Sequence, residues 1–89
     1  MLVRNWITEH IGSGYINFER LRDELLTRAE DAGLDVSARE IRVVLEKLIS
    51  NGNIETCQFL AEDQCYRPTV YDDSNIYWYW FRVKAEASP

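Results

Sequence analysis

The sequence predicts one small α+β domain, and three features support this prediction. Apolar residues recur at helical spacing three times between residues 2 and 51. Two runs rich in β-branched and aromatic residues, 53–59 and 76–83, follow the third helical pattern. The chain has 89 residues, of which 46 % are hydrophobic and 28 % charged, which is enough for one hydrophobic core. We therefore expect a single domain over residues 1–83 and a polar tail over residues 84–89.

The first expected helix covers about ten residues from Leu2, with its apolar residues on one side of a helical wheel. Gly12-Ser13-Gly14 ends it with a flexible turn. His10 falls near the helix end and has no acidic or cysteine partner nearby in the sequence. Tyr15-Ile16 is too short for an independent strand, so we expect it to add to the edge of a sheet formed by later residues.

The second and third helices are delimited by capping residues. Asn17 is an N-cap for a helix from Phe18 to about Ala32, which Gly33 closes. Ser37, followed three residues later by Glu40, is the capping-box pattern at the start of a helix over residues 37–51. Gly52 is suited to the left-handed conformation that ends such a helix.

The two strand-like runs are expected to form a long hairpin. Residues 60–75 connect them, which is long for a hairpin loop. If 76–83 is one continuous strand, its side chains alternate between two faces, and both faces carry aromatic rings. One row of rings then requires cover from the connecting loop, from a partner protein or from a second copy of the chain. The candidate protein-interface residues are Tyr77, Trp78, Tyr79 and Trp80.

The expected order of elements, α-β-α-α-β-β with a small antiparallel sheet, resembles the winged-helix branch of the helix-turn-helix proteins. The resemblance rests on Val36-Ser37, Arg39-Glu40-Ile41, Leu45, Leu48 and Gly52-Asn53-Ile54, and it extends over residues 2–83. It implies that the helix over 37–51 enters the major groove of double-stranded DNA, with the hairpin as a wing against the backbone. The implied function is that of a small transcriptional regulator. Its candidate DNA-binding residues, all outside the apolar stripe of this helix, are Arg39, Arg42, Val43 and Lys47.

The charge pattern leaves a second function open. The net charge is −5, and residues 53–75 hold five acidic residues against Arg67 alone, whereas a phosphate-binding wing needs lysine or arginine. The alternative is a winged helix used as a protein-interaction module, an adaptor or inhibitor that presents an acidic, DNA-like surface. Nucleic-acid bases could in principle stack on the aromatic rings, but the sequence shows no basic groove around them, so this function has little support.

Other classes of protein have little support in the sequence. The single histidine, His10, has no positioned acid, so we expect no enzyme, no cofactor and no metal site. Cys57 and Cys65 lack zinc-ligand spacing, and two free thiols in a cytoplasmic protein are favoured over a hairpin disulfide. No apolar run reaches the roughly 18 residues of a membrane span, and the N-terminus lacks a signal-peptide pattern.

Overall fold

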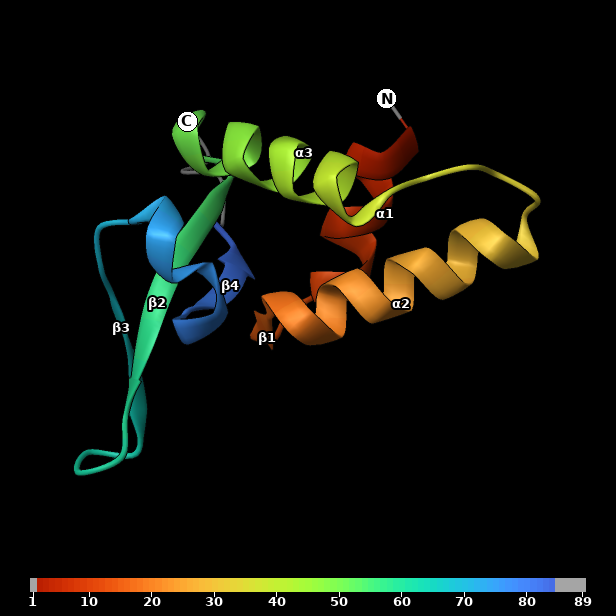
Figure 1. Ribbon diagram of the computed structural model, residues 1–89. Helices are drawn as coiled ribbons and strands as arrows, with labels where there is room; N and C mark the ends of the chain where they lie inside the picture. Colours follow the sequence, from red (N-terminus) through yellow and green to blue (C-terminus); the bar gives the residue numbers. More distant parts are fainter. Residues whose placement is uncertain (1, 85–89) are drawn as a thin grey trace, which may run out of the picture.

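The computed structural model describes residues 2–84 and confirms the α+β class (Figure 1). In chain order the elements are α1 (Leu2–Ile11), β1 (Ile16–Asn17), α2 (Phe18–Asp31), α3 (Ala38–Ser50), β2 (Ile54–Leu60), β3 (Cys65–Pro68), the 3-10 helix η1 (Asp73–Trp78) and β4 (Trp80–Val83). Of the expected tail, only Lys84 lies within the described residues. The structure therefore contains two elements that the expected order α-β-α-α-β-β does not include, the 3-10 helix η1 and the strand β3.

The helix boundaries follow the capping residues that the sequence predicts. The Asn17 side chain accepts a hydrogen bond from the Arg20 amide at 2.9 Å, and Ser37 Oγ accepts one from the Glu40 amide at 3.2 Å. Each bond satisfies one of the amides that lack a partner in the first helical turn. Gly52 has a φ of +78°, the left-handed conformation expected after α3.

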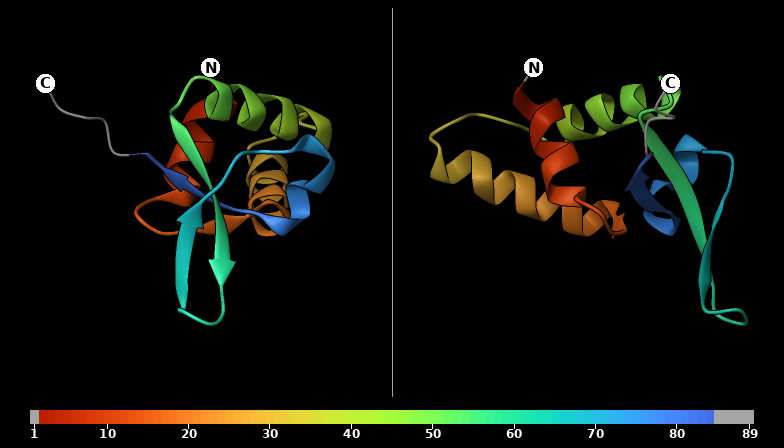
Figure 2. Two further views of the ribbon diagram at one scale, coloured as in Figure 1. Left: turned by 90° about the vertical axis from the view of Figure 1, so that its left-hand side faces the viewer. Right: turned by 180° about the vertical axis from the view of Figure 1, so that it is seen from behind.

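The sheet has four antiparallel strands in the order β1-β4-β2-β3. The short strand β1 pairs at the sheet edge as expected, with Ile16 opposite Phe81. β4 lies between β1 and β2, and Phe81 is also opposite Thr56 of β2. The three α-helices lie together on one side of the molecule, and the β2–β3 hairpin projects beyond them (Figures 1 and 2).

The prediction of a single strand over residues 76–83 was wrong for its first part. Residues 76–78 belong to η1, and only 80–83 form a strand. Asp72 caps η1, because its carboxylate accepts from the Ser74 amide at 3.0 Å and from the Ser74 hydroxyl at 2.8 Å. Ile76 is buried in the core from this turn. The local cap and the burial of Ile76 together favour a helical turn over strand extension.

The expected long connection, residues 60–75, also proved to be partly ordered. Residues 65–68 form β3, which pairs with β2 from Leu60 opposite Cys65 to Cys57 opposite Pro68. The hairpin loop is therefore short, and the chain returns to the sheet by way of η1. The expected two rows of aromatic rings along 76–83 are also absent. They required one continuous strand, and residues 76–78 belong to η1 instead of β4.

One hydrophobic core holds the helices against the inner face of the sheet. Its members come from all three α-helices, from η1 and from the strands, and include Trp6, Leu21, Leu25, Ile41, Leu45, Ile54, Ile76 and Phe81. Phe81 is fully buried at the centre of the sheet. This core fixes α3 with its apolar stripe inward and its polar side toward solvent.

Candidate nucleic-acid interface

The polar side of α3 presents three of the four predicted DNA-binding residues to solvent. Arg39, Val43 and Lys47 are exposed and follow each other at four-residue spacing, which places them in a row along one side of the helix. Val43 keeps 43 % of its surface exposed between the two cations. The opposite side of α3, with Ile41 and Leu45, is fully buried.

Arg42, the fourth predicted residue, lies on the flank of α3 that faces η1. Its guanidinium donates a hydrogen bond to the main-chain carbonyl of Asp73. Its Nε lies 3.6 Å from the Glu46 carboxylate. Arg42 therefore holds the residue 69–79 segment against α3, and it is the one predicted contact residue whose charge is already partnered.

Tyr71 reinforces this attachment. Its hydroxyl donates to Glu46 Oε2 at 2.8 Å, and its ring packs near those of Tyr79 and Phe81. Burial and the adjacent Glu46 carboxylate raise the pKa of the Tyr71 hydroxyl above its ordinary value. The Glu46 carboxylate thus has two partners, the Tyr71 hydroxyl and the Arg42 guanidinium.

Arg4 joins this side of the molecule, and the main chain of Lys84 lies just beyond the end of α3. A groove of about 420 Å³ runs between α1 and α3 and is lined by Val3, Arg39, Glu40, Val43, Val44 and Lys47. A smaller hollow of about 150 Å³ next to it is lined by Arg4, Val44, Lys47, Leu48 and Asn51, so Arg4 lies close to Lys47. Beyond the end of α3, the Lys84 amide donates to the Asn53 carbonyl at 3.0 Å. The tertiary fold brings Arg4 beside Lys47 and the main chain of Lys84 beside Asn53, although Arg4 and Lys84 stand near opposite ends of the chain.

The basic residues divide into two groups according to their partners. Six of the ten lie within 4.0 Å of a carboxylate, namely Arg20, Arg22, Arg28, Arg42, Arg67 and Arg82. Among residues 2–84, no carboxylate lies within this distance of the other four, which are Arg4, Arg39, Lys47 and Lys84. We call these four residues the basic cluster. Arg39 and Lys47 lie on α3, where Glu40 shares their groove. Arg4 lies beside Lys47, and the main chain of Lys84 lies beside Asn53, just beyond α3.

The β2–β3 hairpin has the opposite charge, as the sequence indicates. Glu62 and Asp63 lie exposed in its loop, and the one arginine of the hairpin, Arg67, lies 3.9 Å from Asp63. The hairpin also points away from α3 rather than alongside it (Figure 1). Its end therefore offers neither the charge nor the position of a second phosphate contact.

The four aromatic residues proposed as a protein interface have three different environments. Tyr79 is buried, with 9 % of its surface exposed. Trp80 is half-buried on the outer face of the sheet, where Tyr66 of β3 packs against it with the ring centroids 5.6 Å apart. Tyr77 and Trp78 on η1 remain exposed, at 56 % and 73 %.

Part of the outer face of the sheet is covered by the chain itself. Tyr15 stacks on Tyr66 with ring centroids 3.8 Å apart, and the Phe59 ring, which is 43 % exposed, lies 5.1 Å from that of Tyr66. Cys57 is buried on this face, and burial raises the pKa of its thiol to about 11. Cys57 and Cys65 are both free thiols, as predicted.

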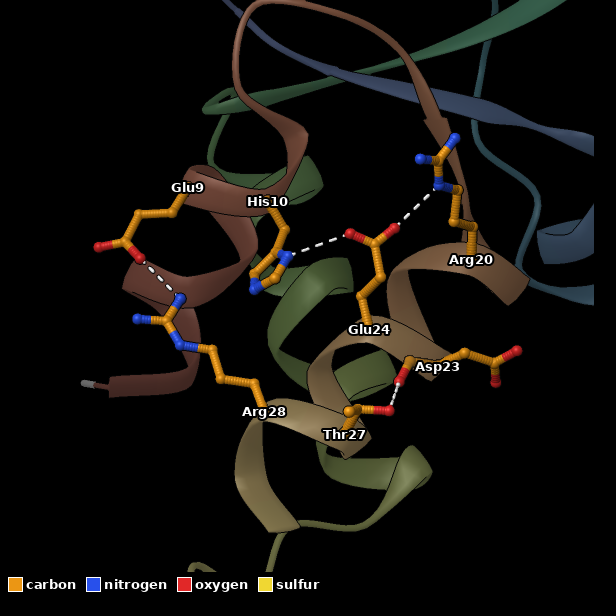
Figure 3. A network of polar contacts seen from close by, with 7 residues as sticks. All are labelled: Glu9, His10, Arg20, Asp23, Glu24, Thr27 and Arg28. Carbon is orange, nitrogen blue, oxygen red and sulfur yellow. Dashed lines mark hydrogen bonds and ion pairs between the residues drawn. The ribbon is translucent and has the colours of Figure 1, made fainter. Parts of the chain in front are cut away.

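A polar network between α1 and α2 surrounds His10 (Figure 3). His10 Nδ1 lies 3.2 Å from Glu24, whose other oxygen accepts from Arg20 at 2.9 Å. Arg28 donates to Glu9 at 2.7 Å and thereby links the same two helices. His10 therefore has an acidic partner that the sequence does not place beside it, because Glu24 lies on the next helix. Each charged group is paired within the network, so we assign it a role in joining α1 to α2.

The described residues and the comparisons add no further site. Over residues 2–84, no three His, Cys, Asp or Glu side chains come together as a metal site would require. None of the helices in this range has the length and apolar character needed to cross a membrane. No family model, curated protein or solved structure matched the chain.

Proposed function

We propose that this protein binds double-stranded DNA through the exposed side of α3, in the manner of a small transcriptional regulator. The observation that supports this proposal is the basic cluster of Arg4, Arg39, Lys47 and Lys84. A cation paired with a carboxylate must give up that interaction to bind a phosphate, whereas a cation without such a partner can neutralise a phosphate directly and release counterions from the DNA. Among residues 2–84, three of the four cations without a carboxylate within 4.0 Å, namely Arg4, Arg39 and Lys47, lie on or beside the exposed side of α3.

The shape of this helix suits insertion into the major groove, which admits one α-helix. Arg39 lies in the first turns of α3, where recognition helices commonly contact base edges. Lys47 and Arg4 lie further along, where contact with phosphates is expected. Arg42 acts mainly by fixing the residue 69–79 segment, because its guanidinium already bonds Asp73 and faces Glu46.

The proposed binding does not use the hairpin as a wing, unlike the winged-helix proteins that the sequence resembles. The acidic hairpin points away from α3. The proposed DNA contacts therefore come from α3 and from the start of α1, without a contact from the hairpin. With at most four phosphate-binding cations, the affinity should be modest and strongly dependent on salt. Between about 50 and 200 mM salt we expect it to fall about 100-fold for four contacts.

The proposal is tested by fluorescence anisotropy with a labelled random-sequence duplex at several salt concentrations. Replacing both Arg4 and Lys47 by Ala should weaken binding and lower the slope of log affinity against log salt by about 2. Arg20→Ala and Arg67→Ala are matched controls, because these exposed arginines lie away from α3 and should leave the slope unchanged. If the wild type does not bind even near 50 mM salt, where phosphate contacts contribute most, the DNA proposal is lost. The protein-interaction alternative would then remain.

A further inference from the structure

The groove between α1 and α3 has an apolar lining that the DNA-binding proposal does not account for. Its volume of about 420 Å³ lies within the range of about 300–1,000 Å³ that is typical of ligand-binding clefts. Three valines line it, Val3 from α1 and Val43 and Val44 from α3. Contacts between the basic cluster and DNA phosphates would leave these aliphatic side chains uncovered.

The two helices hold the valines of this groove in place. Val3 and Val44 are half-buried and pack against the hydrophobic core, whereas Val43 keeps 43 % of its surface exposed. α1 and α3 also pack against each other (Figure 2). A preformed site lowers the conformational entropy that is lost on binding. A hydrophobic groove is a recurring site for the apolar face of a partner's amphipathic helix.

The charged side chains that line the groove are mainly basic. Arg39 and Lys47 line it together with Glu40. The adjoining hollow of about 150 Å³ shares Lys47 and Val44 with the groove and adds Arg4, and none of the described residues that line this hollow is acidic. Glu40 lies about two helical turns before Lys47, so its charge mainly offsets that of Arg39 beside it.

The cations at the Arg4 end are also free to bind an external carboxylate. Within the described range 2–84, neither Arg4 nor Lys47 has a carboxylate within 4.0 Å. Both side chains are exposed. The groove thus combines an aliphatic lining with two unpaired positive charges at one end, which is complementary to an aliphatic surface that carries negative charge.

We propose that this groove binds an acidic amphipathic helix of a partner protein. Aliphatic side chains on one face of that helix would cover Val3, Val43 and Val44, and its aspartates or glutamates would lie beside Arg4 and Lys47. This binding does not require that the protein bind DNA. The two cations cannot contact the helix and a phosphate at once, so the helix would also exclude DNA, a consequence that rests on the proposed function.

The test measures the binding of synthetic peptides by fluorescence anisotropy in the absence of DNA. The first peptide has leucines at positions i, i+3, i+4 and i+7 of a helix and glutamates beside that stripe. The second replaces each glutamate by lysine, and the third replaces each leucine by serine. We expect the first to bind in a saturable manner and the other two at least about tenfold more weakly. Added salt should weaken the first peptide's binding, because the exposed cations contribute to it.

Two variants and a matched control locate the binding in the groove. Val43→Ser and the double variant Arg4→Ala/Lys47→Ala should each weaken the first peptide by at least about fivefold. All three positions are exposed, so the variants should keep the wild-type circular dichroism spectrum. Val70→Ser, which changes an exposed valine that does not line the groove, should leave peptide binding unchanged.

Three results would overturn the proposal. They are equal binding of the lysine peptide, an affinity that either variant leaves unchanged, and self-association of the wild type that Val43→Ser abolishes in sedimentation, because a second copy would then be the occupant. Since these measurements contain no DNA, their failure leaves the DNA proposal to its own test. A failure to bind DNA likewise leaves the peptide result intact.

Discussion

Removal of the Tyr71 hydroxyl is the change that most directly tests how the residue 69–79 segment is held on α3. In Tyr71→Phe the ring can keep its contacts with Tyr79 and Phe81, so the variant removes the bond to Glu46 and little else. That bond is 2.8 Å long and its acceptor is a carboxylate with about a third of its side chain exposed, 30 %. Hydrogen bonds to charged groups contribute about 1.5–3 kcal/mol, and partial exposure places this one at the lower end.

We therefore expect Tyr71→Phe to lower the free energy of unfolding by about 1.5 kcal/mol. For a domain of this size the thermal midpoint should fall by about 6–12 °C. Urea and thermal unfolding, followed by circular dichroism, measure both quantities. Tyr66→Phe is the control, because the Tyr66 hydroxyl has no hydrogen-bond partner among residues 2–84.

A double-mutant cycle identifies the partner. In a Glu46→Ala background, Tyr71→Phe should have almost no effect, because the acceptor is already gone. If Tyr71→Phe leaves the midpoint unchanged, or costs the same in both backgrounds, then Glu46 does not hold Tyr71. The segment would in that case be retained by ring packing and by the bond from Arg42 to the Asp73 carbonyl.

Three further predictions concern single residues. Ser37→Ala should cost about 1 kcal/mol of stability by removing the acceptor for the Glu40 amide, and an unchanged urea midpoint would show that this cap contributes nothing. Thr56→Val should be neutral or stabilising by about 1 kcal/mol, because the buried Thr56 hydroxyl has no partner among the described residues, and a clear loss in the same assay would contradict this. In the native protein at pH 8, a thiol reagent should modify Cys65 much faster than buried Cys57, and equal rates would refute the burial of Cys57. Since folding raises the pKa of Cys57 from near 9 to about 11, its contribution to stability is present below pH 9 and is lost as the pH rises through 11.

The capping residues show what local sequence determines in this chain. Ser37, Asn17 and Gly52 each act on backbone groups within a few residues, so the bounds of α2 and α3 follow from nearby side chains alone. The buried stripe of α3 is predictable for a related reason. Its 3.6-residue period puts Ile41, Leu45 and Leu48 on one side whatever packs against them.

The aromatic run 76–83 shows where local sequence is insufficient. Its composition favours a strand throughout, yet residues 76–78 join η1, because Asp72 caps the turn and Ile76 is buried in the core. Strand propensity depends on which neighbours are available for pairing, and the neighbours of β4 are β1 and residues 54–57 of β2. The separation of exposed Trp78 from half-buried Trp80 follows from this break.

The candidate DNA-binding residues also fall into two groups, those that the sequence alone places and those that only the tertiary structure places. The sequence alone places Arg39, Val43 and Lys47 on the exposed side of α3, because helical periodicity fixes which positions lie opposite the core. Only the tertiary structure places Arg4 beside Lys47 and binds Arg42 to Asp73. These contacts join residues about thirty or more positions apart, and their formation depends on how the whole core packs rather than on any local preference.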